Sequence, residues 1–338
     1  MSAYAELSSD GGRFWDGDDW GWRPLWMTAG QVVEHARACF GVDVRTARML
    51  AEGLLNQTWL LHCSDRDRVL RIGRPERSLE QVLYEQTLSR AWAIGVPQLI
   101  AAETAPAPVT SEQDQVHVLS LFPFRPGVPG TDVPAATRLT QLVPAMATMH
   151  RTAEELGLGQ RPGMSSVDDE PVALRWAAVR RAVEDRFGHG ANVRQTIGKV
   201  DRAVEEVDTQ IQRWRASGRL ERRAAVHGDL NVRNQLYSDG VLVGIIDTDD
   251  CRVEPLIWEV AGLAYSDPAV SPDAAWELYR QAGGSLPPAD REMLLPFARL
   301  GTLSELQWIT DDAGAATHLA LRILGAIADD LGGIPARG

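Results

Sequence analysis

Lysine is almost absent from the 338-residue sequence. Of the 34 lysine and arginine residues only Lys199 is a lysine, so a fixed positive charge must nearly always come from arginine. Cysteine is scarce too, and Cys39, Cys63 and Cys251 lie too far apart for a metal-binding motif. We expect reduced thiols, as in the cytoplasm, and no disulfide framework. No long apolar run predicts a membrane-spanning helix, and the first residues lack the basic and apolar segments of a signal peptide.

The charge of the chain is acidic, with 46 aspartate and glutamate residues against 34 basic ones and a formal net charge of −12. Nucleic acids bind to basic surfaces, so this balance argues against a nucleic-acid partner. Cationic small molecules and magnesium-bound nucleotides remain compatible with it. Hydrophobic residues make up 44%, which together with the length predicts a globular protein of about two domains.

The first 122 residues predict an extended arm followed by a strand-rich domain. Residues 1–27 are rich in glycine, aspartate and tryptophan and show no periodicity, so we expect an arm whose indoles cover an apolar surface. A substrate-capping or dimer-forming role for this arm is the alternative. In the domain at 28–122 the patterns predict two helices, which begin at Thr28 and Ser78. Strands are expected at 42–50, 57–63, 68–73, 98–103 and 116–122, the last two on either side of a proline-rich loop, ETAPAPVTSEQD.

The second part of the chain is predicted to be helical. A segment at 123–134, rich in proline and glycine, is typical of a hinge or linker between domains. In the domain at 135–338 His150 stands beside Met146 and Met149, which predicts a buried histidine with satisfied hydrogen bonds. Amphipathic helices are expected at 135–156, 172–187, 193–217 and after 256, and a strand-rich segment at 224–250.

The strand-rich segment at 224–250 contains the residues that indicate chemistry. Asp229 follows Gly228, which allows a tight loop, and Asn234 comes five residues later. Asp247 ends an apolar strand that we expect to pair back as a hairpin. Two carboxylates and an amide that converge in this way form a hard oxygen site that suits Mg²⁺. A phosphoryl-transfer enzyme needs one carboxylate for the acceptor hydroxyl and oxygen ligands for the metal on the nucleotide phosphates.

The motif HGDLNVRN at 227–234, followed by IIDTDD at 245–250, resembles the aminoglycoside phosphotransferase and choline-kinase-like family, which is related to the protein kinases. The segments EGLLNQTWLL, VLRIG, MATMH and EPLIWEVA agree with that family in order, so the resemblance covers roughly residues 45–265. It implies an α+β, bilobal, protein-kinase-like fold with a small β-rich N-lobe and a larger helical C-lobe. It also implies transfer of the γ-phosphoryl group of ATP or GTP, with Mg²⁺, to a hydroxyl of a small molecule.

The resemblance implies roles for residues of the second domain. Asp229 would orient or deprotonate the acceptor hydroxyl, and Asn234 and Asp247 would bind Mg²⁺. His227 and Glu259 would brace the loop that carries Asp229. The two departures from the family's pattern, at Arg71 and Leu55, lie in the first domain and do not affect Asp229, Asn234 or Asp247, so we expect an active enzyme.

In the first domain the resemblance implies a nucleotide site. Arg71 would contact the nucleotide phosphates in place of the lysine of the wider kinase fold, and Glu85 would hold it. A guanidinium is a planar fork and an ammonium is a point charge, so the contact must differ in geometry. Leu55 stands where the family often has a small hydroxyl side chain. Further nucleotide contacts are implied at Asn56, Phe122 and Phe124.

The acceptor is less closely defined by the sequence. We expect Asp249, Asp250 and Glu254 to receive a cationic or polyhydroxylated acceptor, unless Asp249 and Asp250 are solvated turn residues. The arginine-rich, lysine-poor usage is typical of a GC-rich genome. That fits an antibiotic-producing bacterium, and hence an antibiotic acceptor for resistance or self-protection. Primary-metabolite kinases of the homoserine, choline or sugar type are the first alternative, and a catalytically silent nucleotide-binding regulator is the second.

Other metal chemistries are less compatible with the sequence. A calcium loop that begins at Asp247 would need a glycine where Arg252 stands and an acid where Trp258 stands. A two-metal phosphatase is poorly supplied with ligands, because only His189 and His227 lie between residues 151 and 317. The sequence does not separate a monomer from a homodimer.

Overall fold

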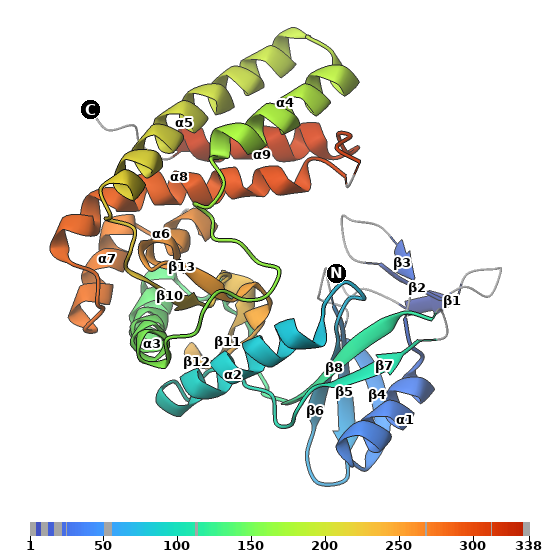
Figure 1. Ribbon diagram of the computed structural model, residues 1–338. Helices are drawn as coiled ribbons and strands as arrows, with labels where there is room; N and C mark the ends of the chain where they lie inside the picture. The colour runs from blue at the N-terminus through green and yellow to red at the C-terminus, as the bar shows by residue number, and fades with distance from the viewer. Residues whose placement is uncertain are drawn as a thin grey trace. The chain divides into compact units, whose positions relative to one another are not determined.

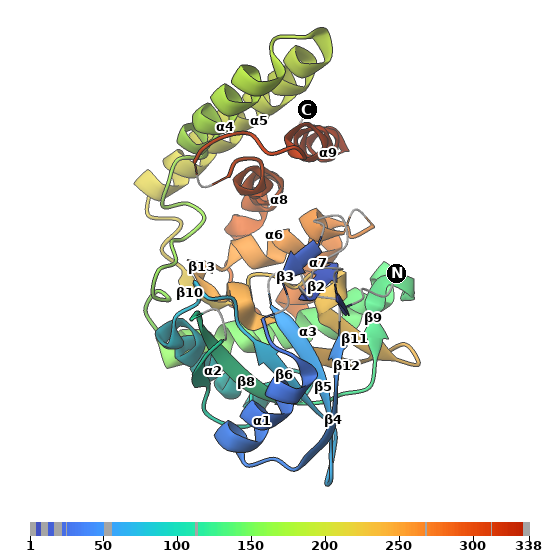
Figure 2. The ribbon, with the colours of Figure 1, turned by 90° about the vertical axis from the view of Figure 1, so that its right-hand side faces the viewer.

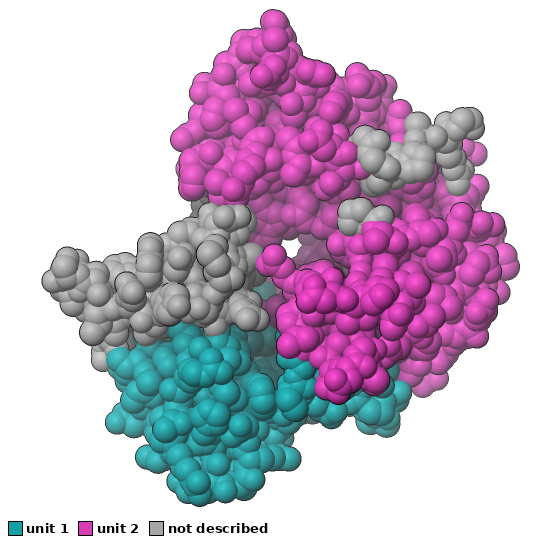
Figure 3. All heavy atoms as spheres, turned by 180° about the vertical axis from the view of Figure 1, so that it is seen from behind, with its two compact units in different colours: residues 1–127, 243–246 teal, residues 128–242, 247–338 magenta. Residues whose placement is uncertain are grey.

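The computed structural model describes residues 26–50, 56–111, 114–267, 269–311 and 313–333, together with the backbone of three short strands before residue 25 (Figure 1). The chain forms two compact units (Figure 3). Unit 1 comprises Met1–Gly127 and Val243–Ile246, and unit 2 comprises Val128–Leu242 and Asp247–Gly338. The first change of unit, after Gly127, falls within the segment at 123–134 that the sequence predicts as a linker.

Unit 1 is built on an antiparallel sheet with the strand order β4-β5-β6-β8-β7. Its strands are β4 (Val44–Leu50), β5 (Gln57–Cys63), β6 (Arg68–Ile72), β7 (Ala107–Thr110) and β8 (Val116–Pro123). Side chains alternate between the two faces of a strand, so Leu70 and Ile72 point to one face and Arg71 to the other. Leu70 and Ile72 belong to the buried core that also contains Val32 and Ala36 of α1 (Ala29–Phe40).

The opposite face of this sheet contacts α2 (Leu79–Gly95), where Gln86 Nε2 donates to Ser120 Oγ of β8. Helices α1 and α2 therefore cover opposite faces of the sheet. Both begin where the sequence predicts, because Thr28 and Ser78 each accept a hydrogen bond from the backbone N–H three residues later. A glutamine at that third position bonds back to the cap residue in both helices, which completes a capping box.

One predicted strand of unit 1 is wrong. Residues 98–103 form only an isolated bridge, in which Ile245 N donates to Gln98 O and Ile100 N donates to Ile245 O. The edge strand is instead β7, within the segment that its prolines mark as a loop. Pro108 pairs with Val118 there, and an edge strand tolerates proline because its outer side needs no N–H donor.

The predicted N-terminal arm contains regular structure that its aperiodic sequence did not predict. Strands β1 (Ala5–Leu7), β2 (Arg13–Asp16) and β3 (Trp22–Pro24) form a separate antiparallel sheet. Of the four tryptophans whose indoles we expect to cover an apolar surface, Trp26 packs against the buried core of unit 1. The side chains of Trp15, Trp20 and Trp22 lie outside the described residues.

Unit 2 is mainly helical, as predicted. Helix α3 packs against α7 and β10, and α6 packs against α7 and α8. The long antiparallel pair α4 and α5 packs with α8 and α9 (Figure 1 and Figure 2). The helices are α3 (Ala135–Leu156), α4 (Val172–Phe187), α5 (Ala191–Ala216), α6 (Ile257–Ser266), α7 (Pro272–Gln281), α8 (Leu294–Ser304) and α9 (Ala320–Gly333). Among the described residues no helix is both long and apolar enough to span a bilayer.

Two small sheets interrupt these helices and flank the loops that carry the HGD motif and Asp247. One pairs β10 (Arg223–Val226) with β13 (Arg252–Pro255). The other has the order β12-β11-β9, from β12 (Val241–Ile245), β11 (Gln235–Ser238) and β9 (Val128–Pro129). Strand β12 begins in unit 2 and ends in unit 1. The predicted hairpin before Asp247 is therefore present as β11 and β12.

Replacing the cap of α2 tests its contribution. Ser78→Ala removes the hydrogen bond to Gln81 N and should lower the free energy of unfolding by about 1 kcal/mol. Urea unfolding measures the change. Ser238→Ala, at an exposed position at the end of β11, is the matched control and should leave stability nearly unchanged. Equal effects of the two substitutions would contradict the capping role.

Candidate active site

The loop between β10 and the short 3-10 helix η3 (Val232–Asn234) contains the HGD motif. Gly228 has a φ of 85°, in the left-handed region that favours glycine. A Cβ atom at this position would lie 2.4 Å from the carbonyl oxygen of Asp250. The loop therefore passes directly against the turn η4 (Thr248–Asp250), and only glycine allows this approach.

The carboxylate of Asp229 is held by two asparagines. Asn234 Nδ2 donates to Asp229 Oδ2 at 2.8 Å and to the Asp229 carbonyl at 2.9 Å. Asn231 Nδ2 donates to Asp229 Oδ1 at 2.6 Å. Asp229 is half-buried, so its carboxylate is fixed in direction yet still accessible. The structure thus brings together Asp229 and Asn234, as the sequence predicts.

Asp247 directly precedes η4 and is exposed, with a left-handed φ of 65°. Among the described residues no group of three or more histidine, cysteine or acidic side chains forms a metal site. The predicted magnesium ligands are one carboxylate and one amide, and Mg²⁺ usually takes only one or two protein ligands beside phosphates and water. Both of these hydrogen bonds of the Asn234 side chain use Nδ2, so Oδ1 is the atom that would bind a metal. This donor set fits Mg²⁺.

The turn after Asp247 concentrates negative charge. Burial raises the pKa of Asp250, and the nearby charges of Asp229 and Asp249 raise it further, against the opposing effect of Arg252 and Arg161. Asp249 and Asp250 are half-buried. A cation beside these carboxylates would be stabilised by their charge.

A chain of buried hydrogen bonds braces the Asp229 loop. Gly228 N donates to Glu259 Oε1 at 2.8 Å, and His150 Nε2 lies 2.8 Å from Glu259 Oε2. His150 Nδ1 lies 3.0 Å from the hydroxyl of Tyr279, so the prediction of a satisfied buried histidine is confirmed. Burial alone would raise the pKa of Glu259, but the hydrogen bond and charge of His150 and the charge of His227 outweigh it and lower that pKa.

His227 lies inside this packing. Its side chain is fully buried, and its Nδ1 accepts a long hydrogen bond of 3.4 Å from the backbone N–H of Asp229. This position agrees with a residue that supports the loop from within.

Glu85 of α2 joins two arginines in unit 1. Arg71 of β6 donates to Oε1 of Glu85, and Arg77 donates to Oε2. The guanidinium carbon of Arg71 also lies 5.1 Å from the ring centre of Phe122 on β8. The predicted Arg71–Glu85 pair is therefore present, and Arg77 is an additional partner that the motif did not identify. The sequence offered one signal for Arg77, which is that it directly precedes Ser78, the capping residue of the helix that carries Glu85.

The other predicted nucleotide contacts are placed as follows. Asn56 is buried directly before β5, and Phe124 follows β8 with its side chain exposed. Residues 51–55, which include Leu55, lie outside the described residues.

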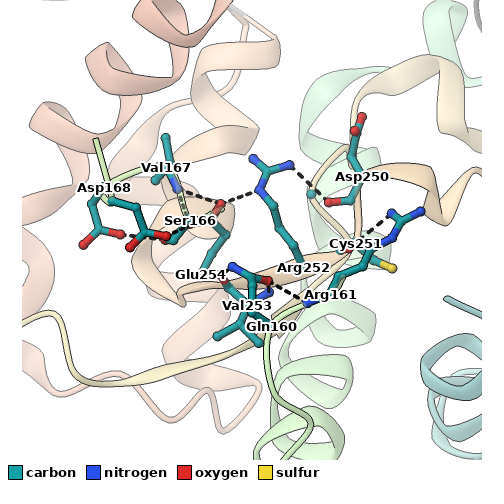
Figure 4. Close-up of polar contacts among 12 residues, drawn as sticks. Gln160, Arg161, Ser166, Val167, Asp168, Asp250, Cys251, Arg252, Val253 and Glu254 are labelled. Carbon is teal, nitrogen blue, oxygen red and sulfur yellow. Dashed lines mark hydrogen bonds and ion pairs between the residues drawn. The ribbon is translucent and has the colours of Figure 1, made fainter. Parts of the chain in front are cut away.

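Glu254 does not face an acceptor, contrary to our expectation. It is fully buried on β13 and accepts hydrogen bonds from Ser166 Oγ, Val167 N and Arg252 Nε (Figure 4). Burial raises its pKa. Sequence did not reveal this because the partners Ser166 and Val167 come from the segment between α3 and α4, far away along the chain.

The same segment fixes the turn that follows Asp247 (Figure 4). The side-chain amide of Gln160 pairs with Val253, donating to its carbonyl at 3.1 Å and accepting from its N–H at 2.8 Å. Arg161 donates to the carbonyls of Asp249 and Cys251. The segment therefore holds the C-terminal part of η4 and the beginning of β13.

A small hollow of about 30 Å³ opens beside Asp229 in unit 2. The loop of Asp229 and Asn231 forms one side, and Trp258, Gly262 and Tyr265 of α6 form the other. These three residues share one helical face because they are three or four positions apart. That spacing is visible in the sequence, but it indicates a site only once the fold places α6 beside the loop of Asp229.

Comparison with known proteins identifies the family. The model of a phosphotransferase enzyme family matches residues 46–295. A search of curated protein sequences found no significant match. Among solved structures, AMP-bound spectinomycin phosphotransferase is similar with a TM-score of 0.61 and 12% identity, over 90% of this chain and 98% of that one.

Two further structures are similar. The microcompartment-associated aminopropanol kinase has a TM-score of 0.59 and 20% identity, over 89% of this chain and 94% of that one. The macrolide 2′-phosphotransferase of Brachybacterium faecium has a TM-score of 0.50 and 17% identity, over 91% and 99%. These similarities confirm the predicted protein-kinase-like α+β fold. The chain belongs to the phosphotransferase enzyme family and is a small-molecule kinase.

Proposed function

We propose that the protein transfers the γ-phosphoryl group of ATP or GTP to a hydroxyl of a small molecule, with Mg²⁺ as the metal and an antibiotic as the first candidate acceptor. The observation that carries this proposal is the carboxylate of Asp229, which Asn231 and Asn234 hold in a fixed direction on a glycine-dependent loop. Similar proteins include a spectinomycin phosphotransferase in complex with ADP and spectinomycin, and an aminoglycoside phosphotransferase with ADP and hygromycin B.

Asp229 would accept a hydrogen bond from the acceptor hydroxyl and direct its oxygen toward the γ-phosphorus. The proton of that hydroxyl would pass to Asp229 as the new P–O bond forms and the bond to the nucleotide breaks. Asn234 Oδ1 and Asp247 would hold Mg²⁺, which neutralises charge on the phosphates when bound. Arg71, held by Glu85, would contact the phosphates through its guanidinium.

The residues around Asp229 support a cationic or polyhydroxylated acceptor. Asp249 and Asp250 lie in the turn next to the loop, and the charge of Asp229 acts on Asp250. We propose that they add contacts to the acceptor or the metal.

The three cysteines are free thiols, which agrees with the cytoplasm as the place of action.

A primary-metabolite kinase is the second candidate. Its support is the similarity to a protein named as an aminopropanol kinase, and aminopropanol is a small amino alcohol. The two candidates differ in acceptor and share Asp229, Asn234 and Asp247. A silent regulator is the least supported, because those three residues are all present.

Asp229→Asn tests the assignment. It should lower the phosphoryl-transfer rate by on the order of 10²–10⁴-fold and leave nucleotide affinity nearly unchanged, because the carboxylate acts on the acceptor. Mass spectrometry would follow the gain of a phosphoryl group by spectinomycin, hygromycin B, a macrolide and aminopropanol, with MgATP and MgGTP. Asp239→Asn, in the exposed turn between β11 and β12, is the matched control. Near-normal turnover of Asp229→Asn would overturn the role.

Glu259→Gln tests the proposed brace through its pH dependence. The folded state lowers the pKa of Glu259, so its ionised form stabilises the fold above the unfolded pKa of about 4.3, and this contribution is lost as the pH falls through the lower folded pKa. The variant should be less stable by about 1–3 kcal/mol at pH 7.

Urea unfolding at several pH values measures this difference, which should shrink on acidification below about pH 4. Glu277→Gln, at an exposed position of α7, is the control. A difference between Glu259→Gln and the wild type that stays constant with pH would contradict an ionised Glu259 in the fold.

A further inference from the structure

The hollow beside Asp229 contains an unusual position in α6. Gly262 lies in the interior of this helix, where glycine is an unfavourable residue. A Cβ atom built on Gly262 would meet no atom within 4 Å, so packing does not require glycine. The missing side chain instead leaves space in the hollow that Asp229 also lines.

Tyr265 lines the same hollow one helical turn further on. Its ring is fixed, because it packs so closely on Gly301 of α8 that a Cβ atom there would lie 2.8 Å from Tyr265 Cδ1. Its hydroxyl donates to Glu305 Oε1 at 2.5 Å, and Glu305 begins the short helix η6 (Glu305–Trp308). Because the phenol proton is given to Glu305, the phenol oxygen acts as an acceptor. The side chain of Ser304 is one partner of this oxygen, and the second lone pair of the oxygen can accept another hydrogen bond.

The charges around this pair are negative. Burial raises the pKa of Glu305, against the opposing effect of the hydrogen bond from Tyr265, and the charges of Asp229, Asp250 and Asp330 raise it further. Burial and the charge of Glu305 raise the pKa of Tyr265, so its hydroxyl stays protonated. A hydrogen-bond donor of an incoming molecule, whether hydroxyl or ammonium, therefore suits this side of the hollow better than an acceptor.

We propose that the hollow at Gly262 receives the part of the acceptor next to the attacked hydroxyl, and that Tyr265, oriented by Glu305, is a specificity-determining residue that accepts a hydrogen bond from it. This inference rests on the proposed function and adds the acceptor subsite to it. It selects acceptors that carry a second hydroxyl or an amino group close to the reacting hydroxyl, on a compact portion of the molecule. Trp258 closes the apolar side of the subsite.

Filling the hollow tests the proposal. Gly262→Ala should be tolerated by the helix, and Gly262→Met should occupy the space beside Asp229. The KM for the acceptor should rise by about tenfold or more in Gly262→Met, with a smaller rise in Gly262→Ala, while the KM for the nucleotide stays unchanged. Gly198→Met is the matched control, because Gly198 also lies inside a helix and its Cβ position is also open.

Tyr265→Phe tests the polar side, since it removes the hydroxyl and keeps the ring on Gly301. It should raise the KM for an acceptor with a neighbouring donor group and have little effect on one without it. The probes are spectinomycin, hygromycin B, a macrolide and aminopropanol, with circular dichroism to confirm folding.

The outcomes separate the subsite from the function. Transfer by the wild type with an unchanged acceptor KM in Gly262→Met, or an equal change in Gly198→Met, would overturn the subsite alone. An equal rise in the acceptor KM of Tyr265→Phe for all probes would overturn the selective role of Tyr265. A wild type that binds nucleotide and phosphorylates none of the probes would count against the proposed function and with it this inference.

Discussion

The position of the Asp229 loop depends on one hydrogen bond, from the backbone N–H of Gly228 to the buried carboxylate of Glu259. A buried anion is stable only when its oxygens are bonded, and His150 bonds the second oxygen while Tyr279 holds the other side of the imidazole. These side chains come from α6, α3 and α7. Three helices that are distant in the sequence therefore set the direction of a single loop. Hydrogen bonds from the side-chain amides of Asn231 and Asn234 then fix the direction of the Asp229 carboxylate.

The near absence of lysine changes how unit 1 presents positive charge. One carboxylate, that of Glu85, bonds Arg71 and Arg77 through its two oxygens. A guanidinium keeps its charge and has donors on several sides, so Arg71 bonds Glu85 and also faces the ring of Phe122. The loop before α2 thus takes part in this charged cluster, since it supplies Arg77.

Much of the fold followed from local patterns. The capping residues Thr28 and Ser78, the short apolar strands and the spacing of Asp229 and Asn234 are all local signals. They predicted the helices, the sheet and the contact between these two side chains. The failures involve contacts between distant segments. Proline marked 107–110 as a loop, although an edge strand accepts it. Glu254 was wrongly expected to contact the acceptor, because its partners Ser166 and Val167 cannot be inferred from its neighbours in sequence. The sequence did not indicate Tyr265, because its orientation depends on contacts with Glu305 and Gly301, which belong to later elements.

Unit 1 is not continuous along the chain, because β12 returns to it at Val243–Ile246. The hydrogen bonds of Ile245 with Gln98 and Ile100 join residues that are made at very different times during translation. On the ribosome, the sheet and α1 can form early, but this edge of the unit must wait until most of unit 2 has emerged. The N-terminal unit therefore reaches its final structure only late in synthesis, and a fragment that ends at Gly127 would lack one of its own strands.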